Sequence, residues 1–292
     1  MIRTGLLTFL GIWLMLTATP AAQQLKALII DGRNNHDWQA TTPVLRKILE
    51  DTGLFKVDVA RSSPSGEDLS GFSPQFDAYD VLISNYNDLA FVEGQMVVGP
   101  LWSQDTRKAF EGYVRSGGGF ISFHSADNAF PEWEEYNTMI ALGGWGGRDE
   151  KSGPFVYYQD GRFVLDNSPG KGGGHGQQHA FEVVIRDDQH PVTKGLPERW
   201  MHVKDELYHQ LRGPVENVTW LATAYSNPET GGTGRHEPVL FAISYGQGRV
   251  FHTTLGHSPE SMTSTGFIVT LQRAAEWAAT GKVTQKIPPE FK

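Results

Sequence analysis

Histidines that directly follow short apolar segments have the clearest chemical potential in this sequence. Residues 120–123 read as a buried strand, and His124 comes directly after them. His36 follows a second apolar segment, residues 26–32. Histidine titrates near neutral pH and also binds metal ions, so both are candidate catalytic residues. The alternative is that each histidine only hydrogen-bonds a neighbouring loop.

A pair of adjacent carboxylates lies further along the chain, at Asp205 and Glu206. On an extended segment, consecutive side chains point to opposite faces, so only one of the two can enter a site. We favour Glu206 as a catalytic acid or base. The alternative is that one carboxylate caps a turn or forms an ion pair with Lys204 or Arg235.

Two later histidines differ in their expected surroundings. His257 follows residues 249–254 and a further short loop segment, so it is a candidate catalytic residue. His252 lies inside the apolar segment, and we expect it to pack in the core.

His175 and His179 are four residues apart, a spacing that would place both on one face of a helix and could bind zinc. The glycines at residues 172–174 and 176 argue against a helix there. A site on a loop with a further ligand is still consistent with the sequence. The pair therefore predicts a divalent metal ion as a possible cofactor, with its identity open.

An open α/β sheet is the framework that would bring such residues together. Strands are expected at residues 26–32, 55–60, 77–86 and 120–123, and helices at residues 42–53 and 103–115. This order favours a flavodoxin-like, doubly wound and mainly parallel sheet, with additional strands in the C-terminal half. Ligands bind at the carboxyl ends of such strands, where His36, the polar residues 85–88 and His124 are expected to converge.

Residues 143–176 hold 11 of the 33 glycines of the chain. A long glycine-rich loop inside a compact domain is usually functional or mobile, so this segment is expected to be either a lid over the site or an exposed insertion. Its glycines do not follow the spacing of a phosphate-binding loop.

The N-terminus and the composition restrict the class of protein. Residues 1–22 read as a secretory signal, with Arg3, an apolar stretch and small residues before Gln23, which predicts a secreted or periplasmic protein; an uncleaved anchor is the alternative. The chain has no cysteine, which excludes disulfides, a thiolate nucleophile and a lipid-modified cysteine. The net charge is −8 and no basic run is present, so we expect no nucleic-acid partner and no stable membrane insertion after cleavage.

Several short motifs occur in an order that resembles the ThuA-like (trehalose utilisation) family. They are Gly117-Gly118-Gly119 with Phe123-His124-Ser125-Ala126, His190-Pro191 with Gly195-Leu196-Pro197, Asp205-Glu206-Leu207-Tyr208, Glu237-Pro238-Val239, Tyr245-Gly246-Gln247-Gly248-Arg249-Val250, Gly256-His257 and Glu276-Trp277-Ala278. The resemblance covers residues 25–283, within a single domain at 23–292. It implies a fold similar to that of class I glutamine amidotransferases, whose cysteine position corresponds to His124 here, so that thiolate chemistry is excluded.

The resemblance also implies carbohydrate catabolism, in which a base removes the acidic proton beside a 3-keto group and the glycosidic oxygen is expelled. We therefore expect a lyase or hydrolase for a (3-keto-)glycoside or related saccharide, with catalytic His124, Glu206, His36 and His257. A non-catalytic carbohydrate-binding or accessory protein is the alternative, and a structural scaffold is a third class. The residues expected to bind substrate are Asp37, Asn85, Asp127, Trp145, Arg148 and Tyr208. The oligomeric state is left open.

Overall fold

The computed structural model describes residue 1 and residues 24–62, 69, 71–93 and 95–291. The predicted signal peptide, apart from Met1, lies outside the described residues. Among the helices that are described, none combines the length and the hydropathy of a membrane span.

The described chain is built around an 11-stranded sheet with the order β11-β10-β13-β14-β15-β6-β3-β1-β2, to which the hairpin β7–β8 is attached through β14. Its strands are β1 (Leu25–Asp31), β2 (Phe55–Arg61), β3 (Val81–Ser84), β6 (Gly119–Phe123), β7 (Phe155–Gln159), β8 (Arg162–Asp166), β10 (His179–Ile185), β11 (Arg199–Asp205), β13 (Val218–Tyr225), β14 (His236–Tyr245) and β15 (Gly248–Thr253). Strands β2, β1, β3, β6 and β15 are parallel neighbours, and the sheet continues from β14 in antiparallel pairs. Two short ribbons, β4 (Leu89–Val92) with β5 (Gln95–Val98) and β9 (Gly174–His175) with β12 (Tyr208–His209), lie outside it.

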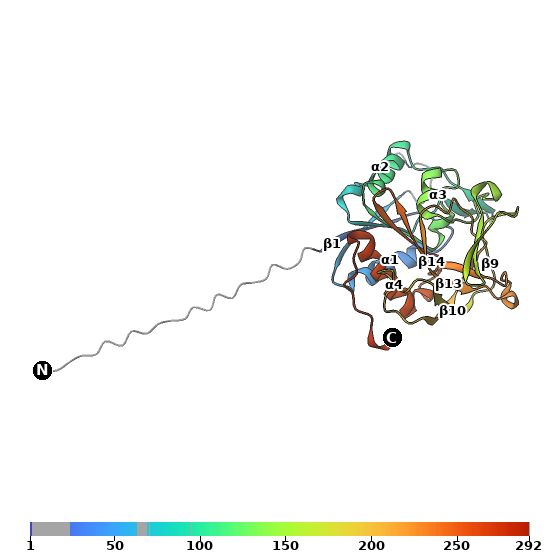
Figure 1. Ribbon diagram of the computed structural model, residues 1–292. Coiled ribbons are helices and arrows are strands. Elements are labelled where there is room, and N and C mark those ends of the chain that lie inside the picture. Colours follow the sequence, from blue (N-terminus) through green and yellow to red (C-terminus); the bar gives the residue numbers. More distant parts are fainter. Residues whose placement is uncertain (2–23, 63–68, 70, 94, 292) are drawn as a thin grey trace.

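Helices cover both faces of the parallel strands (Figure 1). Helices α1 (Trp38–Glu50) and α4 (Thr265–Thr280) pack on one face, and α2 (Gln104–Arg115) and α3 (Glu134–Ile140) pack on the other. Along β1, Ala27 and Ile29 belong to the first core and Leu28 and Ile30 to the second. Because successive side chains of a strand point to opposite faces, a strand with helices on both sides must be apolar throughout. The predicted α/β class, a parallel sheet with extra strands, is therefore confirmed.

Two element boundaries differ from the sequence predictions. Helix α1 begins at Trp38 rather than at residue 42, because the Asp37 side chain accepts a hydrogen bond from the backbone N–H of Ala40 and caps the helix earlier. Pro43 therefore lies inside the helix. Strand β3 is shorter than the predicted 77–86, since residues 76–78 form a 3-10 turn before it.

The glycine-rich segment is more regular than a loop. The hairpin β7–β8 occupies its centre, and Asp160 and Gly161 form the two-residue turn, both with positive φ (50° and 81°). Further along, β9 pairs with β12, so that His175 lies opposite Tyr208. The segment is thus not a purely exposed insertion, since its end reaches the region of Tyr208.

Candidate functional site

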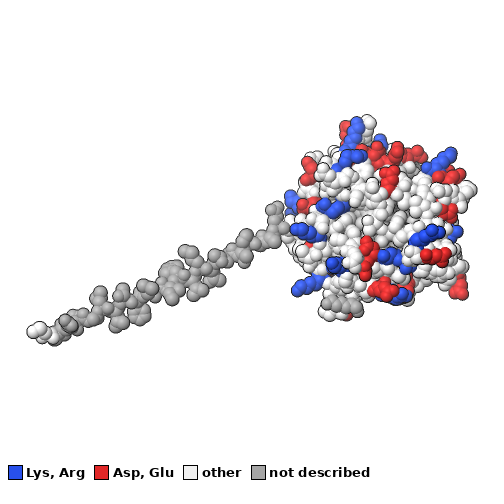
Figure 2. Space-filling model, in the orientation of Figure 1, with Lys and Arg blue, Asp and Glu red and all other residues white. Residues whose placement is uncertain are grey.

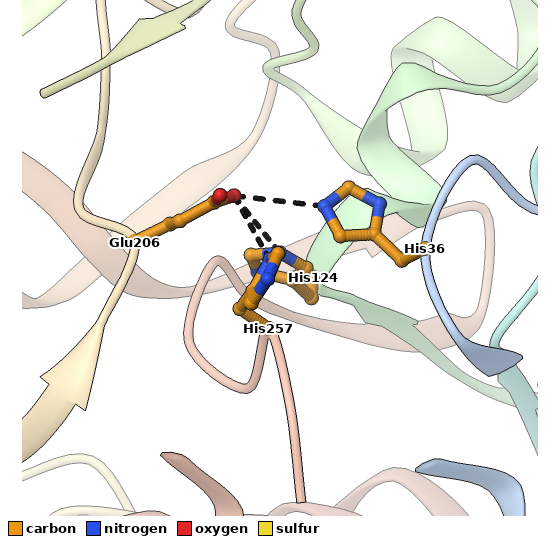
Figure 3. A group of neighbouring side chains, drawn as sticks. All are labelled: His36, His124, Glu206 and His257. Atoms are coloured by element: carbon orange, nitrogen blue, oxygen red, sulfur yellow. Dashed lines mark ion pairs between the residues drawn. The ribbon is translucent and has the colours of Figure 1, made fainter. Parts of the chain in front are cut away.

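Three histidines lie at the carboxyl ends of parallel strands. His36 follows β1, His124 follows β6, and His257 follows β15, while Glu206 lies between β11 and β12. Because these parallel strands end at one edge of the sheet, their terminal residues converge there. In Figure 3 the Glu206 side chain reaches the three imidazoles from the opposite side. The structure thus brings together the four residues predicted as catalytic.

The distances within this group are short. Glu206 Oε2 lies 3.0 Å from His257 Nδ1, 3.5 Å from His36 Nε2 and 3.8 Å from His124 Nε2. One nitrogen from each histidine and one carboxylate oxygen all lie within 4.8 Å of one another. We refer to His36, His124, Glu206 and His257 as the His3Glu cluster.

His124 has a fixed tautomer and an unusual backbone. It opens the 3-10 turn η2 (His124–Asn128) with a φ of 44°, in the left-handed region that non-glycine residues rarely adopt. Its Nδ1–H donates to the carbonyl of Thr254 over 2.6 Å, so Nε2 carries the lone pair and accepts from the Tyr208 hydroxyl over 2.9 Å. Burial, reinforced by the nearby His36, lowers the pKa of His124 to about 3. His124 is therefore a neutral acceptor or ligand at neutral pH and not a proton donor.

His36 is held from the loop that follows β1. Its Nδ1 lies 3.3 Å from Asn34 Oδ1, which also accepts from Asn87 Nδ2 and Ser125 Oγ. Because that amide oxygen can only accept, Nδ1 carries the hydrogen and the lone pair of Nε2 faces the His3Glu cluster. The polar residues after β3 thus support the site through Asn34 without entering it.

Asp205 holds Glu206 and His257 in place. Its Oδ2 accepts from His202 Nε2 and from the backbone N–H of Gly256, both over 2.8 Å. Its Oδ1 accepts from the backbone N–H groups of Glu206 (2.9 Å) and His257 (3.0 Å). Burial opposes its ionisation, but the hydrogen bond from His202 and the other donors outweigh burial and lower the pKa of Asp205. The adjacent carboxylates divide their roles, as predicted from the period of an extended segment, with Glu206 facing the cluster.

The loop that carries His257 depends on Gly256. Its φ is 109°, and a Cβ added there would lie 2.4 Å from the ring of Phe123. Only glycine allows this close approach and this backbone conformation. The turn after β15 therefore directs His257 back over the end of β6.

Glu206 and His257 shift each other's pKa. Burial opposes ionisation of Glu206, yet the neighbouring imidazoles of His257 and His36 outweigh burial and hold the pKa of Glu206 far below its usual range. Burial also opposes a charge on His257, but the carboxylate of Glu206 outweighs it and raises the pKa of His257. Even so, the buried Nδ1 of His257 lacks the alignment for a hydrogen bond with any residue that the structure describes.

A pocket of about 400 Å³ opens beside the His3Glu cluster. Its lining residues are Asn35, His36, Asp37, Asn128, Trp145, His175, Glu206, Tyr208 and His257. Three predicted substrate-binding residues, Asp37, Trp145 and Tyr208, therefore line the pocket. Asn35 and Asn128 were not predicted, although both lie within a few residues of a predicted histidine.

His175 and His179 occupy different surroundings. His175 lines the pocket, with Nε2 3.7 Å from Glu206 Oε1. His179 begins β10, donates its Nδ1–H to the Gln177 carbonyl, and packs on Phe181 rather than lining the pocket. Within the part of the chain that the structure describes, the group that could hold a metal is therefore the His3Glu cluster and not this pair.

Three of the expected substrate-binding residues are buried supports outside the pocket lining. Asn85 donates to the hydroxyls of Thr41 and Thr42 and so ties the end of β3 to α1. Asp127 is fully buried with its Oδ2 3.4 Å from His252 Nε2, and His252 is packed in the core as expected.

Arg148 is the third expected substrate-binding residue that is instead a buried support. Its guanidinium donates to the carbonyls of Asn128, Ala129 and Gly144 and to Asn137 Oδ1. Because these buried acceptors use its donors, Arg148 fixes the segment after η2 and contributes no free charge to a ligand.

Charges on the face seen in Figure 2 are interspersed, with acidic and basic side chains side by side. No continuous basic patch is visible on that face. The pocket itself carries acidic, imidazole, amide and aromatic groups, a set that can bind a polar ring compound, move protons and hold a cation.

Comparison with known proteins places these features in a family. The family model described as ThuA, trehalose utilisation, matches residues 26–278. A ThuA-like protein from Parabacteroides merdae ATCC 43184 is 48% identical, with a TM-score of 0.86 over 92% of this chain and 95% of that chain. A search of curated proteins gave no match.

More distant structures share the fold alone. A ThuA-like protein from Bacteroides uniformis ATCC 8492 is 19% identical, with a TM-score of 0.59 over 92% of this chain and 96% of that chain. A cytoplasmic protein of Salmonella typhimurium is 15% identical, with a TM-score of 0.51 over 87% of this chain and 99% of that chain.

Proposed function

Because the chain belongs to the ThuA family, which is linked to trehalose utilisation and hence to carbohydrate metabolism, we propose that it is an exported enzyme that cleaves a keto-glycoside. The class I glutamine amidotransferase-like fold is shared with its ThuA-like neighbours, but the absence of cysteine excludes a thiolate nucleophile. The reaction proposed is the removal of a proton beside a ketone, followed by loss of the glycosidic oxygen.

One observation carries this proposal. The His3Glu cluster lies against a pocket that is also lined by Trp145 and Tyr208. Aromatic faces suit the C–H surface of a sugar ring, and convergent polar groups fix its orientation. Titratable groups gathered in such a pocket are the usual mark of an acid–base site.

In the proposed reaction a base takes the proton from the carbon that separates the ketone from the anomeric carbon. The electron pair of that C–H bond moves toward the ketone, whose oxygen becomes an oxyanion. The oxyanion then collapses, a C=C bond forms to the anomeric carbon, and the glycosidic C–O bond breaks while its oxygen takes up a proton. Addition of water to the resulting enone gives the hydrolysis products, so lyase and hydrolase outcomes share the first step.

The base and the hydrogen-bond donor for the oxyanion come from different residues of the pocket. The Nδ1–H of His175 faces the Gly176 carbonyl over 2.9 Å, which leaves the lone pair on Nε2 toward the pocket, as a base requires. Burial raises the pKa of Tyr208 well above its usual value, so its hydroxyl stays protonated and can donate to the oxyanion. That hydroxyl donates to His124 Nε2 in this structure and would turn to the oxyanion when substrate binds. A cation held by the His3Glu cluster would offset the same negative charge.

The test is cleavage of 3-keto derivatives of trehalose and of simple alkyl glucosides, with the unoxidised glycosides as controls. We expect turnover of the keto compounds alone, because only the ketone makes the neighbouring proton acidic. His175→Ala is expected to lower kcat by about 100-fold, and His179→Ala, a histidine outside the pocket lining, is expected to leave it unchanged.

A second candidate is a non-catalytic carbohydrate-binding protein, favoured by the same aromatic lining of Trp145 and Tyr208. Saccharide binding without cleavage of any keto-glycoside, with or without divalent metal ions, would establish it in place of the enzyme. Export is tested separately, by the mass and the compartment of the mature chain, since residues 1–22 carry that part of the proposal.

A further inference from the structure

The His3Glu cluster gathers more acceptors at one point than the neighbouring protein donors satisfy, since the Tyr208 hydroxyl has one hydrogen and directs it at His124 Nε2. The Nε2 atoms of His36 and His124 carry lone pairs, because their Nδ1 hydrogens are directed at Asn34 Oδ1 and the Thr254 carbonyl. Both lone pairs lie within 3.8 Å of Glu206 Oε2, which is also an acceptor. Acceptors facing one another in a buried site repel unless a cation lies between them.

His257 adds a third atom to the same point. Its Nδ1 is buried, lies 3.0 Å from Glu206 Oε2, and makes no aligned hydrogen bond to the described residues. An unpaired buried polar atom aimed into a cluster calls for a partner. A cation near the carboxylate would satisfy this nitrogen together with the two lone pairs.

The separations fit a coordination sphere. Ligands about 2.1 Å from a metal lie roughly 3.0 Å apart when they are at right angles and about 3.4 Å apart in a tetrahedron. The three contacts of Glu206 Oε2, at 3.0, 3.5 and 3.8 Å, fall in or near this range. All four ligand atoms lie within 4.8 Å of one another, so small movements of the side chains would bring them into contact with one ion.

The surroundings of the cluster also match those of metal ligands in proteins. Histidine ligands usually donate their other ring N–H to a carbonyl or carboxylate, which fixes the tautomer. His124 does so to Thr254, His36 does so to Asn34, and Asp205 fixes the backbone of both Glu206 and His257. These contacts orient all four ligand atoms toward one point.

From this geometry we propose that His36, His124, Glu206 and His257 bind one divalent first-row transition metal ion. Imidazole nitrogens favour zinc, cobalt, nickel, iron or manganese over calcium and magnesium, which prefer oxygen ligands. The adjoining pocket leaves room for a further ligand on the side of Tyr208 and Trp145. Metal binding rests on the coordination chemistry alone, whereas its role as an electrophile for the ketone oxygen rests on the proposed function.

The experiment uses the purified chain, stripped with a chelator and titrated with Zn²⁺, Mn²⁺ and Co²⁺. We expect one ion per chain by elemental analysis, and a visible absorption band with Co²⁺ that reports nitrogen and oxygen ligands. His36→Ala and His257→Ala each remove one ligand from a partly exposed position, so they are expected to fold and to bind at least about 100-fold more weakly.

His179→Ala is the matched control, because that histidine lies outside the pocket lining, and it is expected to bind like the parent. Far-ultraviolet circular dichroism establishes that each variant is folded. The absence of stoichiometric binding of all three ions to the folded parent, or binding that is unchanged in both ligand variants, would overturn the proposal. Stoichiometric metal without cleavage of keto-glycosides would instead remove the proposed function and leave the metal site intact.

Discussion

Replacing Asp205 by asparagine is expected to destabilise the folded protein by at least about 1.5–3 kcal/mol, because each carboxylate oxygen accepts from two N–H donors. An asparagine amide group must face one pair of donors in either orientation. With the amide nitrogen on the side of His202, that imidazole can change tautomer and accept at Nε2, but the hydrogen bond from the Gly256 N–H is lost. A hydrogen bond to a charged group contributes about 1.5–3 kcal/mol. Asp205 is 1% exposed, so water cannot replace the lost hydrogen bond.

The free energy of unfolding in urea measures this effect, with Asp160→Asn as the control. Asp160 lies in the exposed β7–β8 turn at positive φ, which asparagine tolerates, so its replacement is expected to change stability by less than about 0.5 kcal/mol. A loss below about 1 kcal/mol in Asp205→Asn at neutral pH would refute the account of four accepted hydrogen bonds.

The pH dependence of this difference has a definite sign. The folded-state pKa of Asp205 is lowered, so its stabilisation is present above the unfolded carboxyl pKa of about 3.9 and is lost as the pH falls through the folded value. The parent and Asp205→Asn should therefore converge in stability only in acid. Asp205→Asn should also bind metal more weakly, since the backbone of Glu206 and His257 loses its anchor.

Two further changes test other parts of the molecule. Burial raises the pKa of Glu237 to about 7, so the parent should lose about 3 kcal/mol of stability between pH 4.5 and pH 8, as the proton is released from the folded state. Glu237→Gln can donate to Thr233 Oγ1 and accept from the Gln210 N–H, so its urea stability should lack that decline, and parallel pH curves would contradict the prediction. Tyr208→Phe removes the hydroxyl that reaches His124; kcat on a keto-glycoside should fall by about 100-fold while metal uptake is retained, and an unchanged kcat would exclude the hydroxyl as an oxyanion donor.

The sequence was sufficient to predict the cluster because strand ends follow a simple rule. Apolar segments that end in His36 or His124 must deliver these side chains to the carboxyl edge of a parallel sheet. The period of an extended segment likewise predicted that only one of Asp205 and Glu206 enters the site, although the period did not determine which one. These predictions depend only on local periodicity and on the fold class.

Residues in turns could not be placed by the same reasoning. Asp127, Asn85 and Arg148 are all near the site in sequence, yet their side chains turn to His252, to α1 and to backbone carbonyls. No periodic pattern fixes the direction of a side chain in a loop, and the buried acceptors that attract Arg148 come from other segments. The high glycine content of residues 143–176 led us to expect a long loop. The Asp160-Gly161 pair within it is instead typical of a two-residue hairpin turn, which is what the structure has there.

The position of β15 beside β6 has a consequence for the order of folding. Strand β6 pairs with β3 on one side and, on the other, with β15, which is made more than a hundred residues later (His124 and Thr254, at the ends of the two strands, are 130 residues apart). Until β15 is available, β6 is an edge strand with Phe120 and Ile121 directed at opposite faces. A chain cut before residue 248 would keep this apolar edge, so we expect it to aggregate instead of folding as a shorter unit.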